Sequence, residues 1–151
     1  MGSTFTENQG TTGSGAIYSA ANLVVMDSVF DNNSGNNGAA IKNAGGSLTV
    51  MNTDITNNTG QSAWAGVITN TNTNGKVQIN NSTFDANTGT RTIYNVAQDA
   101  VVIVNNSTFT NQNNNSDDGF AGVLYSGGMG YSGNYAAVYN STFTDLSLIH
   151  I

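Results

Sequence analysis

The chain has 151 residues, of which only 8% are charged, and its formal net charge is −6. This length is enough for one domain with its own core. Nucleic acid and anionic membranes are excluded as expected partners because both need a basic footprint. The absence of cysteine excludes a disulfide framework and thiolate metal sites. No apolar run approaches the length of a membrane span.

A short motif recurs along the chain, and its best copy, Asn80 to Asn87, reads NNSTFDAN. Each copy has a Phe or Ile at the same place in the motif, here called the anchor, and successive anchors lie 25, 25, 29, 25 and 34 residues apart. The anchors are Phe5, Phe30, Ile55, Phe84, Phe109 and Phe143. A spacing in this range is typical of solenoids, propellers and repeat arrays.

The first element of each repeat is a run of alternating apolar residues just before the anchor. The alternating pairs are Leu23 and Val25, Leu48 and Val50, Val77 and Ile79, Val102 and Val104, and Ala136 and Val138. This alternation predicts a strand with one buried face. The anchor and its flanking residues are predicted to form a second short strand.

A polar segment follows the anchors, with Asn at the third position after four of them, Gln112 in its place once, and usually Gly two residues later. These asparagines are Asn8, Asn33, Asn58 and Asn87. Asn and Gly tolerate positive φ, so the segment is predicted to be a turn. In stacked coils the asparagine side chains are expected to form a ladder of hydrogen bonds along the stack.

The third element is a run of small residues that ends in a branched apolar residue pointing inward. The inward residues Ile41, Ile68 and Ile93 join Phe30, Ile55, Phe84 and Phe109 in the predicted core. Three short strands per repeat bury their apolar faces only when the repeats stack, which predicts three parallel sheets around one core. Separate antiparallel hairpins are the alternative, but they predict turn signals at shorter and more variable intervals.

We therefore predict a single all-β domain over residues 1–145, a right-handed single-stranded parallel β-helix of about five coils with ~25 residues each. Residues 146–151 read LSLIHI and break the repeat. They resemble the translation of a transposon end used in sequencing adapters, so we expect a non-native tail on a fragment of a longer protein.

Two motifs of each repeat resemble those of the polymorphic outer membrane protein repeats and of Asn/Thr-rich adhesin-like surface proteins. FTEN, FDNN and FDAN match the first motif, whereas GSGAI and NGAAI match the second loosely. The resemblance implies an extracellular or cell-surface β-helix without catalytic activity, whose role is display or adhesion. Its expected partners are host or community glycans or surface proteins. These motifs are structural, so they specify the fold better than the ligand.

Few residues are candidates for catalysis, and we expect no catalytic residues, no metal site and no cofactor. The only histidine, His150, lies in the suspected tail. Asp31 and Asp54 are expected to be diagonal neighbours, about 7–8 Å apart, on the outer face of one sheet. That separation suits a pair of hydrolytic carboxylates. A fragment of a polysaccharide lyase or glycoside hydrolase of β-helix fold is therefore the alternative function, although acids beside turns are common in solvated positions.

Aromatic residues give the candidate ligand site. Tyr125 follows an inward leucine and should point outward, while Tyr131 and Tyr135 lie in a Gly-rich loop predicted over residues 126–139. Long insertions in solenoids often lie at the binding face, so Tyr131 and Tyr135 are predicted to stack on sugar rings, and Tyr125 is a third candidate ligand-binding residue. The alternative is a Gly-rich loop whose tyrosines pack back on the coil. Open strands at both ends also predict self-association.

Overall fold

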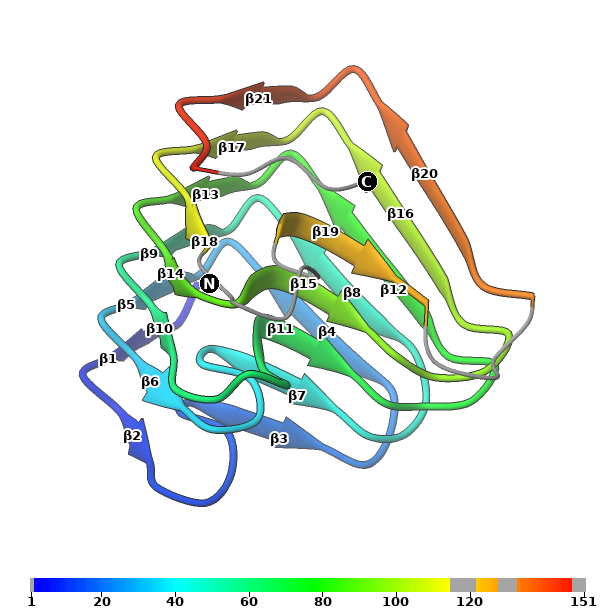
Figure 1. The fold of residues 1–151 in the computed structure, drawn as a ribbon, viewed down its shortest axis with the longest axis horizontal. Helices are drawn as coiled ribbons and strands as arrows, with labels where there is room; N and C mark the ends of the chain where they lie inside the picture. Colours follow the sequence, from blue (N-terminus) through cyan, green and yellow to red (C-terminus); the bar gives the residue numbers. More distant parts are fainter. Residues whose placement is uncertain (1, 115–121, 128–132, 148–151) are drawn as a thin grey trace.

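The computed structural model describes residues 2–114, 122–127 and 133–147, and these residues form a parallel β-solenoid (Figure 1). The predicted all-β parallel solenoid is confirmed. Each strand pairs in parallel with the equivalent strand of the next coil, so four sheets run side by side along the stack. We call them sheets A to D, in the order in which the chain enters them.

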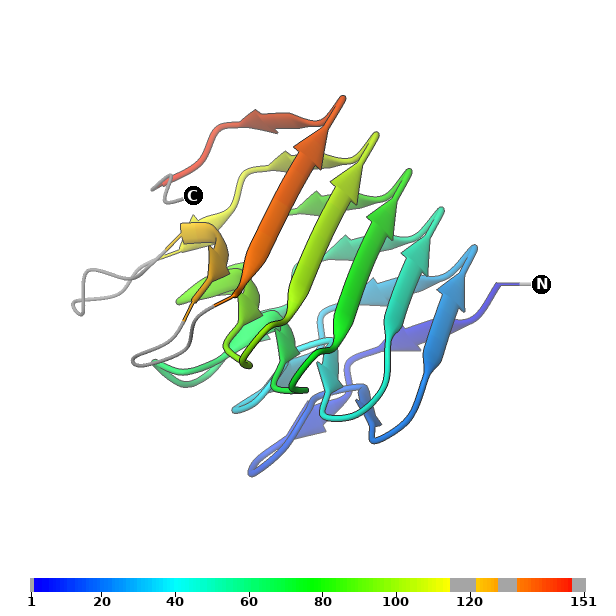
Figure 2. The same cartoon turned by 90° about the vertical axis from the view of Figure 1, so that its right-hand side faces the viewer.

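Sheet A has six described strands, and sheets B, C and D have five each. Sheet A contains β1 (Thr4–Thr6), β5 (Val29–Asp31), β9 (Asp54–Thr56), β13 (Thr83–Asp85), β17 (Thr108–Thr110) and β21 (Thr142–Thr144). Sheet B contains β2 (Gln9–Gly10), β6 (Ser34–Gly35), β10 (Thr59–Gly60), β14 (Thr88–Gly89) and β18 (Asn113–Asn114). Sheet C contains β3 (Ile17–Ser19), β7 (Ile41–Asn43), β11 (Gly66–Asn70), β15 (Arg91–Asn95) and β19 (Gly122–Ser126). Sheet D contains β4 (Leu23–Met26), β8 (Leu48–Met51), β12 (Lys76–Asn80), β16 (Val101–Asn105) and β20 (Tyr135–Tyr139), which face the viewer in Figure 2.

The prediction of three sheets was wrong, because the segment predicted as a turn forms the two-residue strands of sheet B. Its backbone continues the ladder: the Thr59 N–H donates to the Asn33 carbonyl at 2.8 Å, and the Thr88 N–H to the Asn58 carbonyl at 2.9 Å. Two residues are too few to show an alternating pattern in the sequence. These strands form because backbone N–H groups of one coil donate hydrogen bonds to carbonyl groups of the neighbouring coil.

The expected place of the left-handed residue was also wrong. The ladder asparagines do not have positive φ; the residue directly before each one does, as at Asn32 (φ 54°) and Asn57 (φ 56°). A second set of left-handed residues, including Asn81 and Asn106, forms the corner between sheets D and A. One left-handed residue turns the chain sharply, and asparagine adopts this conformation more readily than most residues. The following side chain then points into the coil.

The core is built from the anchors and from the inward residues of sheets C and D. Phe84 lies between Ile55 and Phe109 in register, and all three are fully buried. The rings of Phe84 and Phe109 stack with centroids 4.5 Å apart, and those of Phe109 and Phe143 at 4.8 Å. Ile41, Ile68 and Ile93 form the facing column and are also fully buried.

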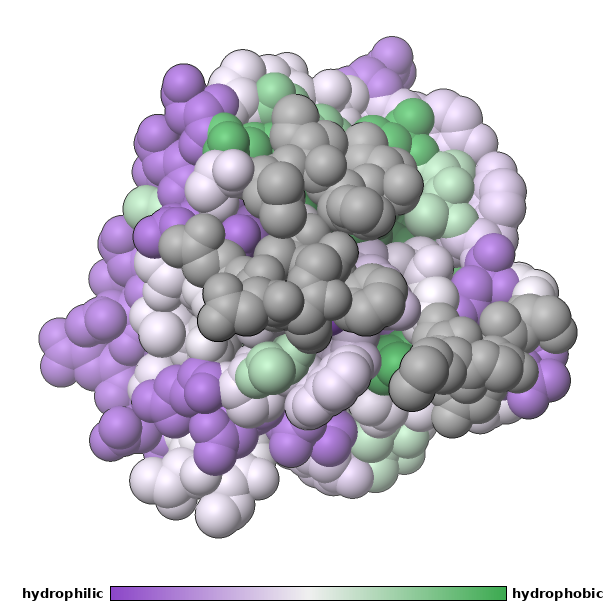
Figure 3. Space-filling view, viewed as in Figure 1, coloured by the Kyte–Doolittle hydropathy of each residue, from purple (hydrophilic) through white to green (hydrophobic). Residues whose placement is uncertain are grey.

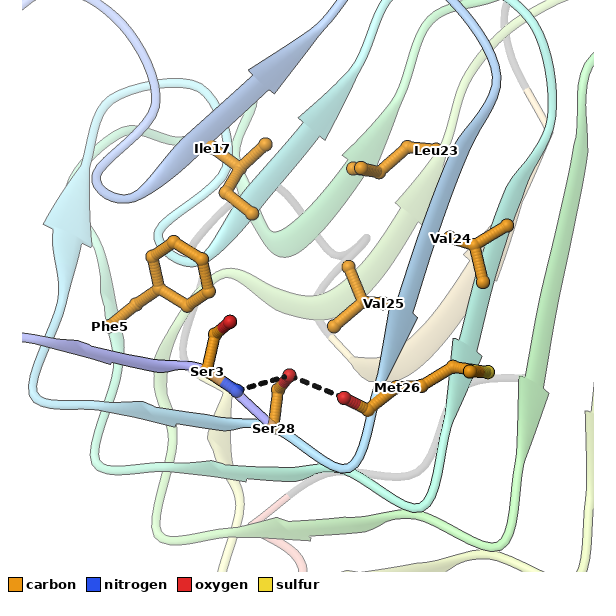
Figure 4. A pocket seen from close by; sticks show the side chains of 8 residues that line it. All are labelled: Ser3, Phe5, Ile17, Leu23, Val24, Val25, Met26 and Ser28. Atoms are coloured by element: carbon orange, nitrogen blue, oxygen red, sulfur yellow. Dashed lines mark hydrogen bonds between the residues drawn. The ribbon is translucent and has the colours of Figure 1, made fainter. Parts of the chain in front are cut away.

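The coil at the β1 end leaves the core open. In Figure 4, Phe5, Ile17 and Leu23 point toward one another around a hollow of about 390 Å³, while Val24 and Met26 point to the other side of β4. The Ser28 hydroxyl donates to the Met26 carbonyl and accepts from the Ser3 N–H at the rim of this hollow. This end is therefore less closed than the middle of the stack.

Candidate functional site

The predicted asparagine ladder is confirmed and runs inside the coil between sheets A and B. Each side-chain amide donates to the amide oxygen of the next coil: Asn8 to Asn33 at 2.8 Å, Asn33 to Asn58 at 2.9 Å and Asn58 to Asn87 at 3.0 Å. Gln112 takes the next place and accepts from Asn87 at 3.3 Å. The column satisfies polar groups that would otherwise be costly to bury. Its role is structural.

A second ladder joins sheets C and D and was missed in the sequence. The Asn43 amide donates to Asn70 at 2.9 Å, Asn70 to Asn95 at 2.7 Å, and Asn95 to the Ser126 hydroxyl oxygen at 2.9 Å. The signal was present, because each of these residues lies two positions after the inward Ile or Leu. Residues two apart on a strand share one face, so these side chains had to point inward too.

A third polar column consists of the small residues before the anchors. The hydroxyls of Ser82 and Ser107 each donate at 2.8 Å to the carbonyl two residues earlier in the chain. Each hydroxyl oxygen also accepts a backbone N–H from the previous coil, as from Ser82 to Ser107 at 3.2 Å. These three columns hold the corners of the coil and leave the outer faces of the sheets as the surface that can meet a partner.

Asp31, one of the two candidate carboxylates on sheet A, is held by neighbouring side chains. Asp31 accepts hydrogen bonds from the Thr56 hydroxyl and the Asn57 amide, both at 2.8 Å. The bond from Asn57 and then that from Thr56 lower the pKa of Asp31. Asp54 lies opposite Val29, so Asp31 and Asp54 are diagonal neighbours. A lowered pKa makes Asp31 a poor proton donor for glycoside hydrolysis.

Two further acids on this side of the coil also pair with amides. Asp85 accepts from Asn111 at 2.8 Å, and Asp27 accepts from Asn52 at 3.0 Å. Asp85 ends β13, whereas Asp27 is a left-handed corner residue (φ 51°) before β5. In Figure 3, hydrophilic residues gather along the edge where the chain passes from sheet A to sheet B. These acids therefore belong to a solvated, hydrogen-bonded surface.

On the outer face of sheet C, aromatic side chains surround a buried arginine. The Arg91 side chain is 1% exposed, and its Nη1 donates to the Ala63 carbonyl at 2.6 Å. The guanidinium carbon lies 4.6 Å from the ring centre of Tyr94 and 4.9 Å from that of Tyr125. These cation–π contacts use Tyr125 to hold a side chain of its own chain. The sequence offered no signal for this cluster.

The outer face of sheet D carries the exposed tyrosines. Tyr135 and Tyr139 are 53% and 51% exposed, and a hydrogen bond between their side chains raises the pKa of Tyr135. Tyr135 begins β20 and is not part of a loop, contrary to the prediction. The structure also separates the predicted trio, since Tyr125 lies on sheet C and Tyr135 on sheet D. Tyr131 lies outside the described residues.

The outward residues of sheet D form rows across the strands. Ala137 follows Ile103 and Gln78 in the central row, and Tyr139 follows Asn105 and Asn80 in the row beside it. The Asn105 amide donates to the Asn80 amide oxygen at 3.0 Å. The face therefore combines exposed rings with neutral amides, the two kinds of group that usually contact sugars.

The described residues contain no group of three or more His, Cys, Asp or Glu side chains placed to hold a metal ion. No helix long and apolar enough to cross a membrane occurs in the same part of the chain.

Three comparisons with known proteins also give no relative. No protein-family model matches the chain, and no match was found among the curated proteins or among the solved structures. The fold and its side-chain columns alone define its class: the chain is a parallel β-solenoid with buried asparagine ladders.

Proposed function

We propose that this chain is an adhesin-like solenoid without catalytic activity, displayed on a cell surface or secreted, whose role is structural display or adhesion. The supporting observation is that inward and outward residues of each coil have different roles. The inward polar residues satisfy one another in ladders, while sheets A and D present rows of outward side chains on broad faces. A rigid body with repeated outer rows is suited to contact an extended partner.

The chemistry of the acids supports binding over catalysis. A hydrolase of this fold needs one carboxyl group that stays protonated near neutral pH as a general acid. Asp31 has the opposite property, because its hydrogen bonds from Asn57 and Thr56 favour the ionised form. The hydrogen bonds on Asp31 therefore give no support to a general-acid role for this residue.

The direct test displays the chain on the surface of a bacterium that does not adhere by itself. We expect the displaying cells to bind surfaces coated with polysaccharide, mucin or cells more strongly than cells that display a scrambled chain. Equal adhesion of the two strains to all three surfaces would overturn the adhesive role.

The enzyme alternative needs its own assay on the purified chain. Reducing-end and unsaturated-product assays across a panel of polysaccharides, with and without calcium, should show no turnover. Turnover that is lost in Asp31→Asn or Asp54→Asn would replace the adhesion proposal with a carbohydrate-active enzyme.

A further inference from the structure

We propose that the outer face of sheet D is a binding site for a neutral, extended, β-linked polysaccharide that lies along the solenoid axis. This inference rests on the proposed adhesive function and names its ligand class. It starts from the two exposed tyrosines, Tyr135 and Tyr139, which lie at the two ends of β20. They project from the same face of β20, with Ala137 between them in the strand.

The small residue between the tyrosines creates a broad platform. Ala137 is only 9% exposed, although it lies on the outward side of the strand, so its larger neighbours shield it. Aromatic rings offer sugars a flat apolar surface for the C–H groups of the pyranose ring, and a tyrosine hydroxyl adds a polar contact at its edge. The rings of the two tyrosines can therefore stack on sugars, and their hydroxyl groups can make polar contacts at the edge of the platform.

The neighbouring strands supply polar contacts for a longer ligand. On β16 and β12, Asn105 and Asn80 continue the row of Tyr139, and Gln78 lies in the adjacent row. Their amides both donate and accept hydrogen bonds, which suits sugar hydroxyls. Among the outward residues of the described strands of sheet D, Lys76 is the only charged one. A neutral polysaccharide therefore suits this face better than an anionic one.

The direction of the ligand follows from the repeat. Adjacent strands of a sheet lie ~4.8 Å apart, close to the length that one pyranose adds to an extended β-linked chain. A sugar stacked on the tyrosines of β20 would place the following sugars over β16 and β12. An α-linked glucan curves and would lose these later contacts. The site therefore distinguishes linkage as well as charge.

The test measures binding of the full 151-residue chain to cellohexaose, xylohexaose and mannohexaose by calorimetry and saturation-transfer NMR, with maltohexaose as the α-linked comparison. We expect at least one β-linked hexasaccharide to bind more tightly than maltohexaose. Changing both Tyr135 and Tyr139 to Ala should weaken that binding by about tenfold or more. Tyr139→Phe keeps the ring and should retain most of the affinity.

The matched control is Tyr18→Ala, which removes an exposed tyrosine from sheet C and should leave binding unchanged. Circular dichroism spectra must show that each variant keeps the fold. Three results would overturn the glycan site: no binding of any β-linked probe, equal binding of maltohexaose, or binding that survives the double change. If the displayed chain still mediated adhesion after any of these results, adhesion would stand and only this site would be lost.

Discussion

At the scale of single residues, the anchor column carries the largest predicted stability effect. Phe84 is fully buried and stacks on Phe109, so Phe84→Ala leaves a cavity between two coils. We expect this change to lower the free energy of unfolding by ~3–5 kcal/mol. Urea denaturation measures it. Thr83→Ala, on the outward side of the same strand, is the control and should change stability little. Equal losses for the two variants would contradict the stacked core.

Two adjacent asparagines test the different roles of the ladder and of the left-handed corner: Asn58 belongs to the ladder, and Asn57 forms the corner. The Asn58 amide donates to the Phe30 carbonyl and to Asn87, whereas Asn57 is an exposed left-handed residue. Asn58→Gly should cost ~1–3 kcal/mol because buried partners lose their hydrogen bonds. Asn57→Gly should cost less, since glycine accepts positive φ without strain and only the exposed hydrogen bond to Asp31 is lost. Thermal unfolding of both variants makes the comparison, and the reverse order would disprove the assignment.

Asp31 should make part of the stability depend on pH. Its pKa is lowered in the folded chain by hydrogen bonds from Asn57 and Thr56, so the unfolded chain takes up the proton first as the pH falls. The contribution of ionised Asp31 to the free energy of unfolding is therefore present above the pKa of this residue in the unfolded chain, about 3.9. It is lost as the pH falls through the lower pKa in the folded chain. Urea unfolding from about pH 7 to about pH 3 should show a shallower decline for Asp31→Asn. If the stability of the unchanged chain and of Asp31→Asn declined in parallel with pH, Asp31 would not contribute to the pH dependence.

At the scale of strands and sheets, the sequence predicted those features that leave a periodic pattern of residues. The register of the anchors and the inward positions of sheet D follow from two repeats that a reader of the chain can see: the spacing of about 25 residues and the alternation of side chains. Sheet B shows the spacing but not the alternation, because its strands have only two residues. The Arg91 cluster also escaped prediction, since it depends on how Ala63 in a connecting loop meets sheet C.

The tyrosine pair tests the geometry of β20 without any ligand. The hydrogen bond with Tyr139 raises the pKa of Tyr135 above its ordinary value of 10.0. In Tyr139→Phe that bond is lost, so the pKa of Tyr135 should fall back toward 10.0. Alkaline titration followed by ultraviolet absorbance of the phenolate measures the change, and Tyr18→Phe serves as the comparison. If the pKa of Tyr135 stayed equally raised in Tyr139→Phe, the side chains of Tyr135 and Tyr139 would not be in contact.

At the scale of the whole molecule, closure of the core differs along the stack. Phe5 and Ile17 in the first coil are only partly buried, whereas Ile68 and Phe84 in the middle are fully buried. Amides of β1 and β3 should therefore exchange with solvent much faster than those of β11 and β13. Hydrogen exchange followed by mass spectrometry gives the order. Uniform protection along the stack would show that the chain unfolds as one unit.

The open end of the core also predicts how copies of the chain meet in solution. The hollow beside Phe5 and Leu23 is lined by the first strands of sheets A, C and D, whose outer edges can receive another chain. We expect concentration-dependent association in sedimentation velocity, reduced in Phe5→Lys because a charge at the open end is costly to cover.

Val24→Lys separates the two possible contacts, since Val24 is 62% exposed on the outer face of the same coil. Association through the end of the stack should persist in this variant. If Val24→Lys abolished it and Phe5→Lys did not, the copies would meet through sheet D. The face proposed for polysaccharide would then be shared with a second copy, and glycan and self-association would compete for it.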